Sequence, residues 1–186
     1  MRLFVGLDLP PAVVGNLERL IERLRRAATG SGRIQWSPPA NLHVTTKFIG
    51  EWPEARLGEL EAALAALPPG PPIPVSVGQL GFFPNPHSPR VFWCGIQAPG
   101  LGELAAATDR ATSGLGIASE TRPYSAHLTL ARIKDRINPQ PLNAAIAALP
   151  SLDFGAFEAR CFFLYRSQLH RTGSVYTKLS GFPLNP

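Results

Sequence analysis

Asn41-Leu42-His43-Val44-Thr45-Thr46-Lys47-Phe48-Ile49 and Tyr124-Ser125-Ala126-His127-Leu128-Thr129-Leu130-Ala131-Arg132-Ile133 share one short pattern, His-x-Thr-x. Both stretches are apolar and contain β-branched residues, which indicates β-strands. Residues i and i+2 of a strand point to the same face of the sheet. Each copy therefore places an imidazole and a hydroxyl side by side. We expect Val44 and Leu128 to point to the opposite face, into a core.

The order of predicted elements repeats around the two patterns. Hydrophobic periodicity predicts each element, with alternation for strands and a spacing of three to four for helices. A strand over residues 2–9 comes first. The first half then reads as a helix over 11–28, an extended segment over 35–39, the first motif strand over 42–49, a helix over 54–67 and strands over 73–83 and 90–97. The second half reads as a helix over 101–115, an extended segment over 117–121, the second motif strand over 126–133, a helix over 139–149, and strands over 154–165 and 174–179 around a turn at 170–173.

This repeated order predicts an α+β fold. We expect a single two-lobed domain over residues 1–186, pseudo-duplicated, with repeats at roughly 11–98 and 101–181. Equivalent strands of a duplication are often neighbours in space. Antiparallel sheets should then line a central cleft, with the helices outside. The cleft floor would carry the histidine and the threonine of both motifs: His43, Thr45, His127 and Thr129.

Composition limits the classes of protein that fit. A chain of 186 residues, with 45% hydrophobic and 17% charged residues, is one globular domain of ordinary size. The net charge of +5 favours an anionic partner, such as nucleic acid or a phosphorylated small molecule, although a generically basic surface explains it equally well. Cys94 and Cys161 lie in apolar runs, so we expect buried, reduced thiols and a cytoplasmic location. We expect no signal peptide and no membrane span.

Two histidines across a cleft suit acid–base catalysis, because an imidazole titrates near neutral pH and can give or take a proton. Hydrolysis of a phosphodiester needs such an acid and base, and also donors for the non-bridging oxygens. Thr45 and Thr129 offer hydroxyl donors. Arg132 is five residues beyond His127, so in a regular strand it would face away. It must therefore act from the strand end or across a bulge.

These side chains have other possible uses. A single strand histidine is usually structural, but two copies in matching positions favour function. Zinc needs further ligands, and the chain has no His-Glu-x-x-His, Cys-x-x-Cys or His-x-His, with Asp8 the only candidate third ligand. We therefore expect no metal and no cofactor. His87 and His170 read as solvated loop residues.

Four aromatic residues could stack on a nucleobase. Phe48 and Tyr124 lie close to the motifs, and for them a core position and a stacking role are both open. Trp36 is a further candidate. Trp93, between Phe92 and Cys94, reads as core.

At these residues the sequence resembles the 2H phosphoesterases, and within them the bacterial 2′-5′ RNA ligase / RNA 2′,3′-cyclic phosphodiesterase family. The resemblance covers almost the whole chain. It includes both motif stretches, Arg2 to Pro10, Pro89 to Trp93, Ser167-Gln168-Leu169 with Gly173 and Tyr176, and Phe182-Pro183-Leu184. Two positions depart from the family pattern: Ala126 replaces the usual proline, and Thr46 replaces an aliphatic residue.

The resemblance implies metal-independent opening of RNA 2′,3′-cyclic phosphate ends to 2′-phosphomonoesters. His43 would protonate the leaving 3′-oxygen and His127 would activate water, while Thr45, Thr129 and Arg132 hold the phosphate. Partners would be RNA with such ends or related cyclic nucleotides, and the protein would act as a monomer. Two alternatives stay open: reversible 2′-5′ ligation of RNA, which runs the same chemistry backwards, and a non-catalytic RNA- or nucleotide-binding module.

Overall fold

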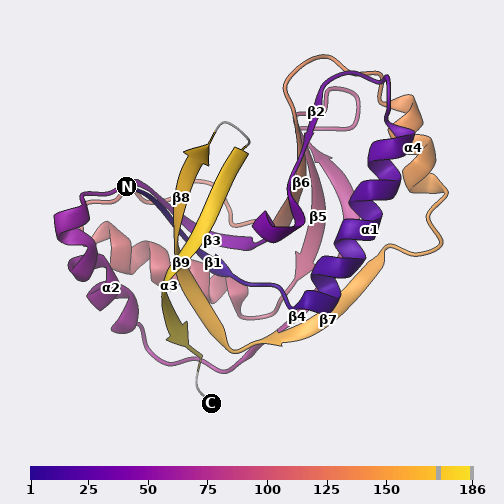
Figure 1. Ribbon diagram of the computed structural model, residues 1–186. Helices are drawn as coiled ribbons and strands as arrows, with labels where there is room; N and C mark the ends of the chain where they lie inside the picture. Colours follow the sequence, from indigo (N-terminus) through magenta and orange to yellow (C-terminus); the bar gives the residue numbers. More distant parts are fainter. Residues whose placement is uncertain (171–172, 185–186) are drawn as a thin grey trace.

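Two antiparallel sheets form the centre of the molecule (Figure 1). The computed structural model describes residues 1–170 and 173–184, and within them it contains four α-helices and nine strands. The predicted α+β class is confirmed. In chain order the elements are β1 (Arg2–Leu7), α1 (Pro11–Ala27), β2 (Ile34–Trp36), β3 (Val44–Glu51), α2 (Leu57–Ala65), β4 (Ile73–Phe83), β5 (Val91–Gln97), α3 (Leu101–Ser113), β6 (His127–Ile133), α4 (Gln140–Ala147), β7 (Asp153–Ala159), β8 (Cys161–His170) and β9 (Gly173–Pro183), with short 3₁₀ turns at Pro39–Asn41 and Glu54–Arg56.

The two halves of the chain are interleaved in the sheets. One sheet has the strand order β3-β1-β8-β9, and the other has the order β2-β6-β5-β4-β7. The first motif strand, β3, therefore shares its sheet with the hairpin that ends the chain. The second motif strand, β6, pairs with β5 from the first half. Each sheet needs strands from both halves, so neither half can complete a sheet alone.

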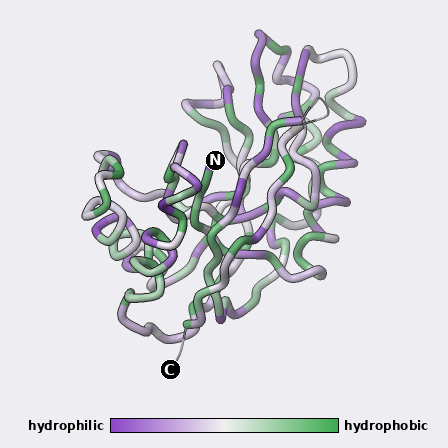
Figure 2. Tube along the Cα trace, turned by 60° about the vertical axis from the view of Figure 1, so that its left-hand side comes forward, coloured by the Kyte–Doolittle hydropathy of each residue, from purple (hydrophilic) through white to green (hydrophobic). Residues whose placement is uncertain are grey.

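The helices cover the outer faces of the sheets. α1 buries one stripe of side chains and packs against β7 and α4, outside the five-stranded sheet. The stripe consists of Val13, Leu17, Leu20, Ile21 and Leu24. α3 packs on β3 and against α2, and these two helices cover the four-stranded sheet on the other side of the molecule (Figure 1). Hydrophobic residues follow the central strands, and hydrophilic ones gather on outer turns and helix faces (Figure 2).

Two predicted segments do not form one continuous strand each. The segment 117–121, predicted to be extended, contains no strand, and the carbonyl oxygen of Ala118 within it accepts a hydrogen bond from Lys47 of β3. The single strand predicted over 154–165 is two strands, β7 and β8, with Arg160 between them. β7 belongs to the five-stranded sheet and β8 to the four-stranded one. The chain therefore passes from one sheet to the other at Arg160. Hydrophobic alternation continues through this point because both strands face a core, so the sequence pattern does not show where one strand ends and the next begins.

The last strand and the two cysteines differ in detail from the prediction. β9 extends to Pro183, beyond the predicted end at 179, and residues 171–172 of the predicted turn lie outside the described residues. Cys94 is buried, which raises the pKa of its thiol to about 12, whereas Cys161 is only half-buried. Both thiols are free. No helix in the described ranges is both long enough and apolar enough to cross a bilayer.

Candidate active site

His43 and His127 are held by the same kind of hydrogen bond. The Nδ1 atom of His43 lies 2.7 Å from the carbonyl oxygen of Asn41, and that of His127 lies 2.8 Å from the carbonyl oxygen of Ser125. Because a carbonyl only accepts, Nδ1 carries the hydrogen in both rings. Nε2 is then the atom of each imidazole that can exchange a proton. β3 and β6 approach one another from different sheets, so the two rings belong to one site.

The threonine of each motif is fixed through its backbone. The carbonyl oxygen of Thr45 accepts a hydrogen bond from Tyr124 at 3.0 Å, and that of Thr129 accepts one from Ser37 at 2.7 Å. Val44 and Leu128 are fully buried, which confirms the face predicted for them. Strand alternation then places both threonine side chains on the histidine face. The site thus gains two hydroxyl groups on anchored backbone.

Each motif strand has a β-bulge one residue after its threonine. In the β1–β3 pair, Thr45 lies opposite Gly6 and Lys47 opposite Val5, so Thr46 is the extra residue. In the β5–β6 pair, the extra residue is Leu130. Both residues after each threonine are buried: Thr46 and Lys47 in β3, Leu130 and Ala131 in β6. A bulge shifts the alternation by one residue, so the third residue after each threonine returns to the histidine face.

These third residues are Phe48 and Arg132. The bulge accounts for the position of Arg132, which regular alternation could not explain. Both side chains are exposed, and Phe48 is 56% exposed. Tyr124 is 38% exposed. Neither aromatic residue belongs to the core, so of the two uses weighed for them, stacking is the one that their exposure permits.

His43 lies among aromatic rings. Its ring centroid is 4.4 Å from that of Phe4 and 5.0 Å from that of Tyr176, which meets it edge-on. Burial lowers the pKa of His43 below the ordinary 6.5, and the positive charge of His127 adds to this, while the Asn41 carbonyl and the Asp8 carboxylate oppose it. In the protein without substrate, His43 therefore favours its neutral form. In the sequence, Tyr176 stands out only through the family resemblance, and no local pattern signals its contact with His43.

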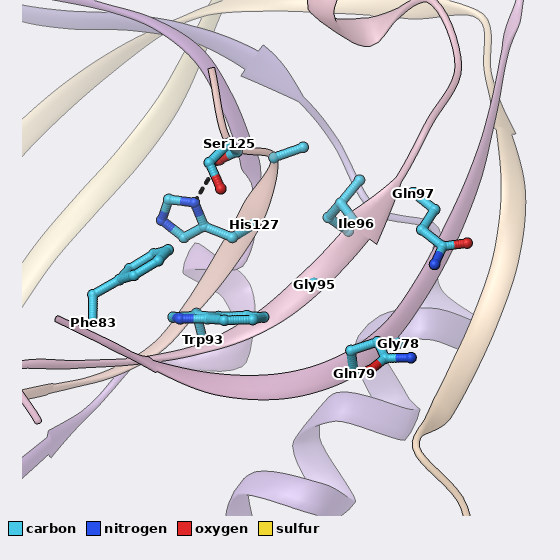
Figure 3. A pocket seen from close by; sticks show the side chains of 10 residues that line it. Gly78, Gln79, Phe83, Trp93, Gly95, Ile96, Gln97, Ser125 and His127 are labelled. Atoms are coloured by element: carbon cyan, nitrogen blue, oxygen red, sulfur yellow. Dashed lines mark hydrogen bonds between the residues drawn. The ribbon is translucent and has the colours of Figure 1, made fainter. Parts of the chain in front are cut away.

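His127 lies at the edge of a hollow (Figure 3). Its ring meets Phe83 edge-on at a centroid distance of 5.3 Å, and Phe83 in turn packs on Trp93 at 5.3 Å. The hollow has a volume of about 260 Å³. Trp93 is half-buried and lines it, so the prediction of a core position was wrong. Alternation along β5 carried the signal: Phe92 and Cys94 are buried on one face, which turns Trp93 to the other.

Comparison with known proteins identifies the family. A model of the "LigT like Phosphoesterase" family matches residues 7–93 and 96–176, which is most of the chain. The chain belongs to this family. The predicted resemblance to the 2H phosphoesterases is thereby confirmed.

Individual members of the LigT-like phosphoesterase family agree over the full length. An RNA 2′,3′-cyclic phosphodiesterase of Methanocaldococcus jannaschii is 33% identical over 176 residues, covering 95% of this chain and 96% of that protein. The crystal structure of TT0787 of Thermus thermophilus superposes with a TM-score of 0.81 at 30% identity, covering 99% of this chain and 98% of that one. The structure of E. coli LigT complexed with 3′-AMP has a TM-score of 0.77 at 25% identity, covering 100% and 98%.

The other polar residues singled out in the sequence lie apart from the LigT-like site or support it indirectly. His87 is exposed in the loop between β4 and β5. Asp8 forms an ion pair with Lys178. Trp36 is half-buried and packs edge-on against Phe92 at 6.0 Å. Across residues 1–170 and 173–184, no three His, Cys, Asp or Glu side chains are grouped as a metal site requires.

Proposed function

We propose that this LigT-like phosphoesterase hydrolyses RNA 2′,3′-cyclic phosphate ends to 2′-phosphomonoesters by acid–base catalysis with His43 and His127. The observation that carries the proposal is the matched pair of Nδ1–carbonyl bonds, which fixes both rings with Nε2 as the proton-exchanging atom. An in-line displacement at phosphorus needs a base for the attacking oxygen and an acid for the leaving oxygen, on opposite sides. Two imidazoles from two facing strands meet that need.

The mechanism follows from this arrangement. Nε2 of His127 takes a proton from water as the water oxygen bonds to phosphorus. The bond between phosphorus and the 3′-oxygen breaks, and Nε2–H of His43 gives its proton to that oxygen. The hydroxyl groups of Thr45 and Thr129 and the guanidinium of Arg132 donate hydrogen bonds to the non-bridging oxygens, where charge accumulates. The phosphate stays on the 2′-oxygen.

Protonation of His43 depends on the substrate. Burial lowers the pKa of His43, so the ring favours the neutral form before substrate binds. A phosphodiester brings a negative charge next to the ring, and a nearby opposite charge favours the protonated form. Substrate binding therefore supplies the condition for His43 to act as the acid. The depressed pKa also makes the protonated ring a stronger proton donor.

The relatives support the same substrate class. The Methanocaldococcus jannaschii protein is an RNA 2′,3′-cyclic phosphodiesterase by name and matches this chain from end to end. The E. coli LigT complex with 3′-AMP shows that a nucleotide binds a protein of this fold. A net charge of +5 suits an RNA end.

The decisive assay uses a short oligonucleotide with a 2′,3′-cyclic phosphate end, in the presence of EDTA. The wild-type protein should open the ring, and comparison of the product with 2′- and 3′-phosphate standards should locate the phosphate on the 2′-oxygen. His43→Ala and His127→Ala should each lower kcat/KM on the order of 10²–10⁴-fold.

His87→Ala is the matched control, because it removes an exposed imidazole outside the site. Its activity should equal that of the wild type. Full activity in either motif-histidine variant would contradict the acid–base proposal, and a 3′-phosphate product would contradict the choice of leaving oxygen.

A further inference from the structure

The two motif histidines belong to sheets that share no strand. β3 follows His43 in the four-stranded sheet, and β6 begins with His127 in the five-stranded sheet. Ladder hydrogen bonds hold each strand within its own sheet, but they set no distance from one sheet to the other. An in-line displacement needs both imidazoles at defined distances from one phosphorus atom. Contacts that cross from one sheet to the other therefore set the geometry of the site.

Three consecutive residues in front of β6 connect the two sheets. The hydroxyl of Tyr124 donates a hydrogen bond to the carbonyl oxygen of Thr45 in β3 at 3.0 Å. The carbonyl oxygen of Ser125 accepts the hydrogen bond that orients the His127 ring (Figure 3). The carbonyl oxygen of Ala126 accepts a hydrogen bond from a backbone N–H of β5 at 3.3 Å. The residue that holds the His127 ring thus lies between one residue bonded to each sheet.

From this we propose that Tyr124 is a positioning residue, whose hydroxyl sets the separation of His43 and His127 by joining β3 to the residues that lead into β6. A bulge follows Thr45 directly, so the Tyr124 bond anchors β3 at the point where its ladder is interrupted. The effect on the reaction rests on the proposed function, whereas the separation of the two rings exists without a substrate. This role belongs to the hydroxyl and is separate from stacking by the aromatic ring.

The chain before Tyr124 is bonded to β3 a second time. Nζ of Lys47 donates to the carbonyl oxygen of Ala118 at 2.6 Å and to the Asp109 carboxylate at 2.5 Å. The same carboxylate accepts a hydrogen bond from the N–H of Glu120 at 3.1 Å. The backbone that leads to Tyr124 is therefore held by β3 and α3. Because this backbone is already ordered, the Tyr124 hydroxyl meets its acceptor at a low entropy cost.

The hydrogen bond of Ser37 provides the matched control. Ser37 donates its hydroxyl to the carbonyl oxygen of Thr129 at 2.7 Å, as Tyr124 does to that of Thr45. Ser37 follows β2, which is the neighbour of β6 in the five-stranded sheet, and its N–H bonds the carbonyl oxygen of Leu130 at 2.8 Å. Its bonds therefore stay within one sheet. Ser37→Ala and Tyr124→Phe each remove one hydroxyl from a motif threonine carbonyl, but only Tyr124→Phe removes a contact between the sheets.

Repulsion between the two protonated rings reports their separation. Burial is the main cause that lowers the pKa of His43, and the positive charge of His127 lowers it further, whereas its carbonyl partner and the Asp8 carboxylate raise it. Two tyrosines beside the ring are uncharged near pH 6.5, and one nearby lysine is paired with the carboxylate: Tyr165, Tyr176 and Lys178. A larger separation weakens the repulsion and therefore raises the pKa of His43.

NMR titration of the histidine rings, in the protein without substrate, measures this pKa. Tyr124→Phe should raise the pKa of His43, and Ser37→Ala should leave it unchanged. Because a loss of burial would also raise it, Tyr124→Phe is repeated in a His127→Gln background, where the second charge is absent. There it should have no further effect, since coupled residues give non-additive changes. No rise in the single variant, or an equal rise in both backgrounds, would overturn the proposal.

Steady-state kinetics on adenosine 2′,3′-cyclic phosphate give the second readout. Tyr124→Phe should lower kcat by roughly tenfold with little change in KM, because the rings are less often in the reactive geometry while the aromatic surface remains. Ser37→Ala should lower kcat less. A loss confined to KM, or equal losses of kcat in the two variants, would contradict the positioning role. Failure of the wild type to open the cyclic phosphate overturns the proposed function instead, and the substrate-free titration then decides on the separation of the rings alone.

Discussion

The two motif strands share one geometry and differ in chemistry. β6, and β3 together with His43 directly before it, each carry His-x-Thr, a bulge, two buried residues and one exposed residue on the histidine face. The exposed residue is Phe48 in β3 and Arg132 in β6. His43 sits among aromatic rings, whereas His127 borders an open hollow. The repeated strand pattern thus sets the direction of each side chain, and the residues around each histidine set its chemical environment.

The residues behind the bulges differ as well. Ala131 fills its place in β6 as a small apolar group, but Lys47 in β3 is a buried cation. Its ammonium lies 2.5 Å from Asp109 in α3 and 2.6 Å from the carbonyl oxygen of Ala118. Tyr124, further along the same segment, bonds the Thr45 carbonyl. β3 is therefore tied to the segment 114–126, which leads directly into His127.

Phe48 in β3 and Arg132 in β6 occupy equivalent positions, and we expect the largest difference in catalytic effect between these two residues. Arg132→Ala should lower kcat/KM for a cyclic-phosphate end on the order of 10²–10³-fold, because it removes charge donors at the reacting phosphate. Phe48→Ala should cost only about tenfold, mainly through KM, since it removes a stacking surface. Steady-state kinetics on both variants test this. Equal losses in kcat for the two would remove the distinction.

Substitution of Lys47 tests whether its buried ion pair with Asp109, on the side of β3 opposite the histidine face, stabilises the protein. Lys47→Met should lower the free energy of unfolding by about 3 kcal/mol, because the side chain is 1% exposed and its loss removes the cation beside Asp109 and the donor to the Ala118 carbonyl. Denaturant unfolding measures the change. Lys178→Met is the matched control: its pair with Asp8 is exposed, and such pairs contribute about 0–1 kcal/mol. A comparable loss in both variants would show that burial of Lys47 is irrelevant.

The environments of the two histidines should also appear in the pH profile, as the smallest effect. The active form carries one proton on the two rings together, so activity falls at low pH when both rings are protonated. The second proton binds to the ring with the lowered pKa, His43, and the acidic limb of the profile therefore lies below pH 6.5. Asp8 raises the pKa of His43 by its charge. Asp8→Asn should therefore move the acidic limb of kcat/KM to still lower pH. A shift toward higher pH, or no shift, would show that the pKa of His43 does not set the acidic limb.

The sequence was most informative where a pattern repeats. Two copies of His-x-Thr, with Val44 and Leu128 turned inward, predicted the histidine face correctly. The bulge in the first motif strand was not predicted, because one extra residue leaves no turn signal. A bulge in the second motif strand was one of the two options predicted for Arg132, and the register confirms it. The consecutive apolar residues Leu130 and Ala131 were the available sign. The role proposed for Arg132 gained its geometric basis only from the strand register.

Residues whose environment depends on distant strands were the hardest to place. Trp93 reads as core from its apolar neighbours, yet it faces a hollow because Gly81 lies across from it. Lys47 gives no sign of burial, since its partner Asp109 is far away in sequence. The passage of the chain between the two sheets at Arg160 leaves no mark in the sequence pattern, because both sheets are apolar on one face. The pseudo-duplication itself stays a prediction, which the matched bulges support.

The interleaving of the sheets has a consequence for folding. β1 pairs with β8, so Arg2 lies opposite Ser167, and the first strand made must wait for the last quarter of the chain. Contacts of such long sequence separation slow folding, because loop closure precedes the stabilising pairing. During synthesis, the sheet that carries His43 stays incomplete until the C-terminal hairpin emerges. A chain released early therefore has the first histidine but no finished catalytic cleft, and ring-opening chemistry begins only with the complete molecule.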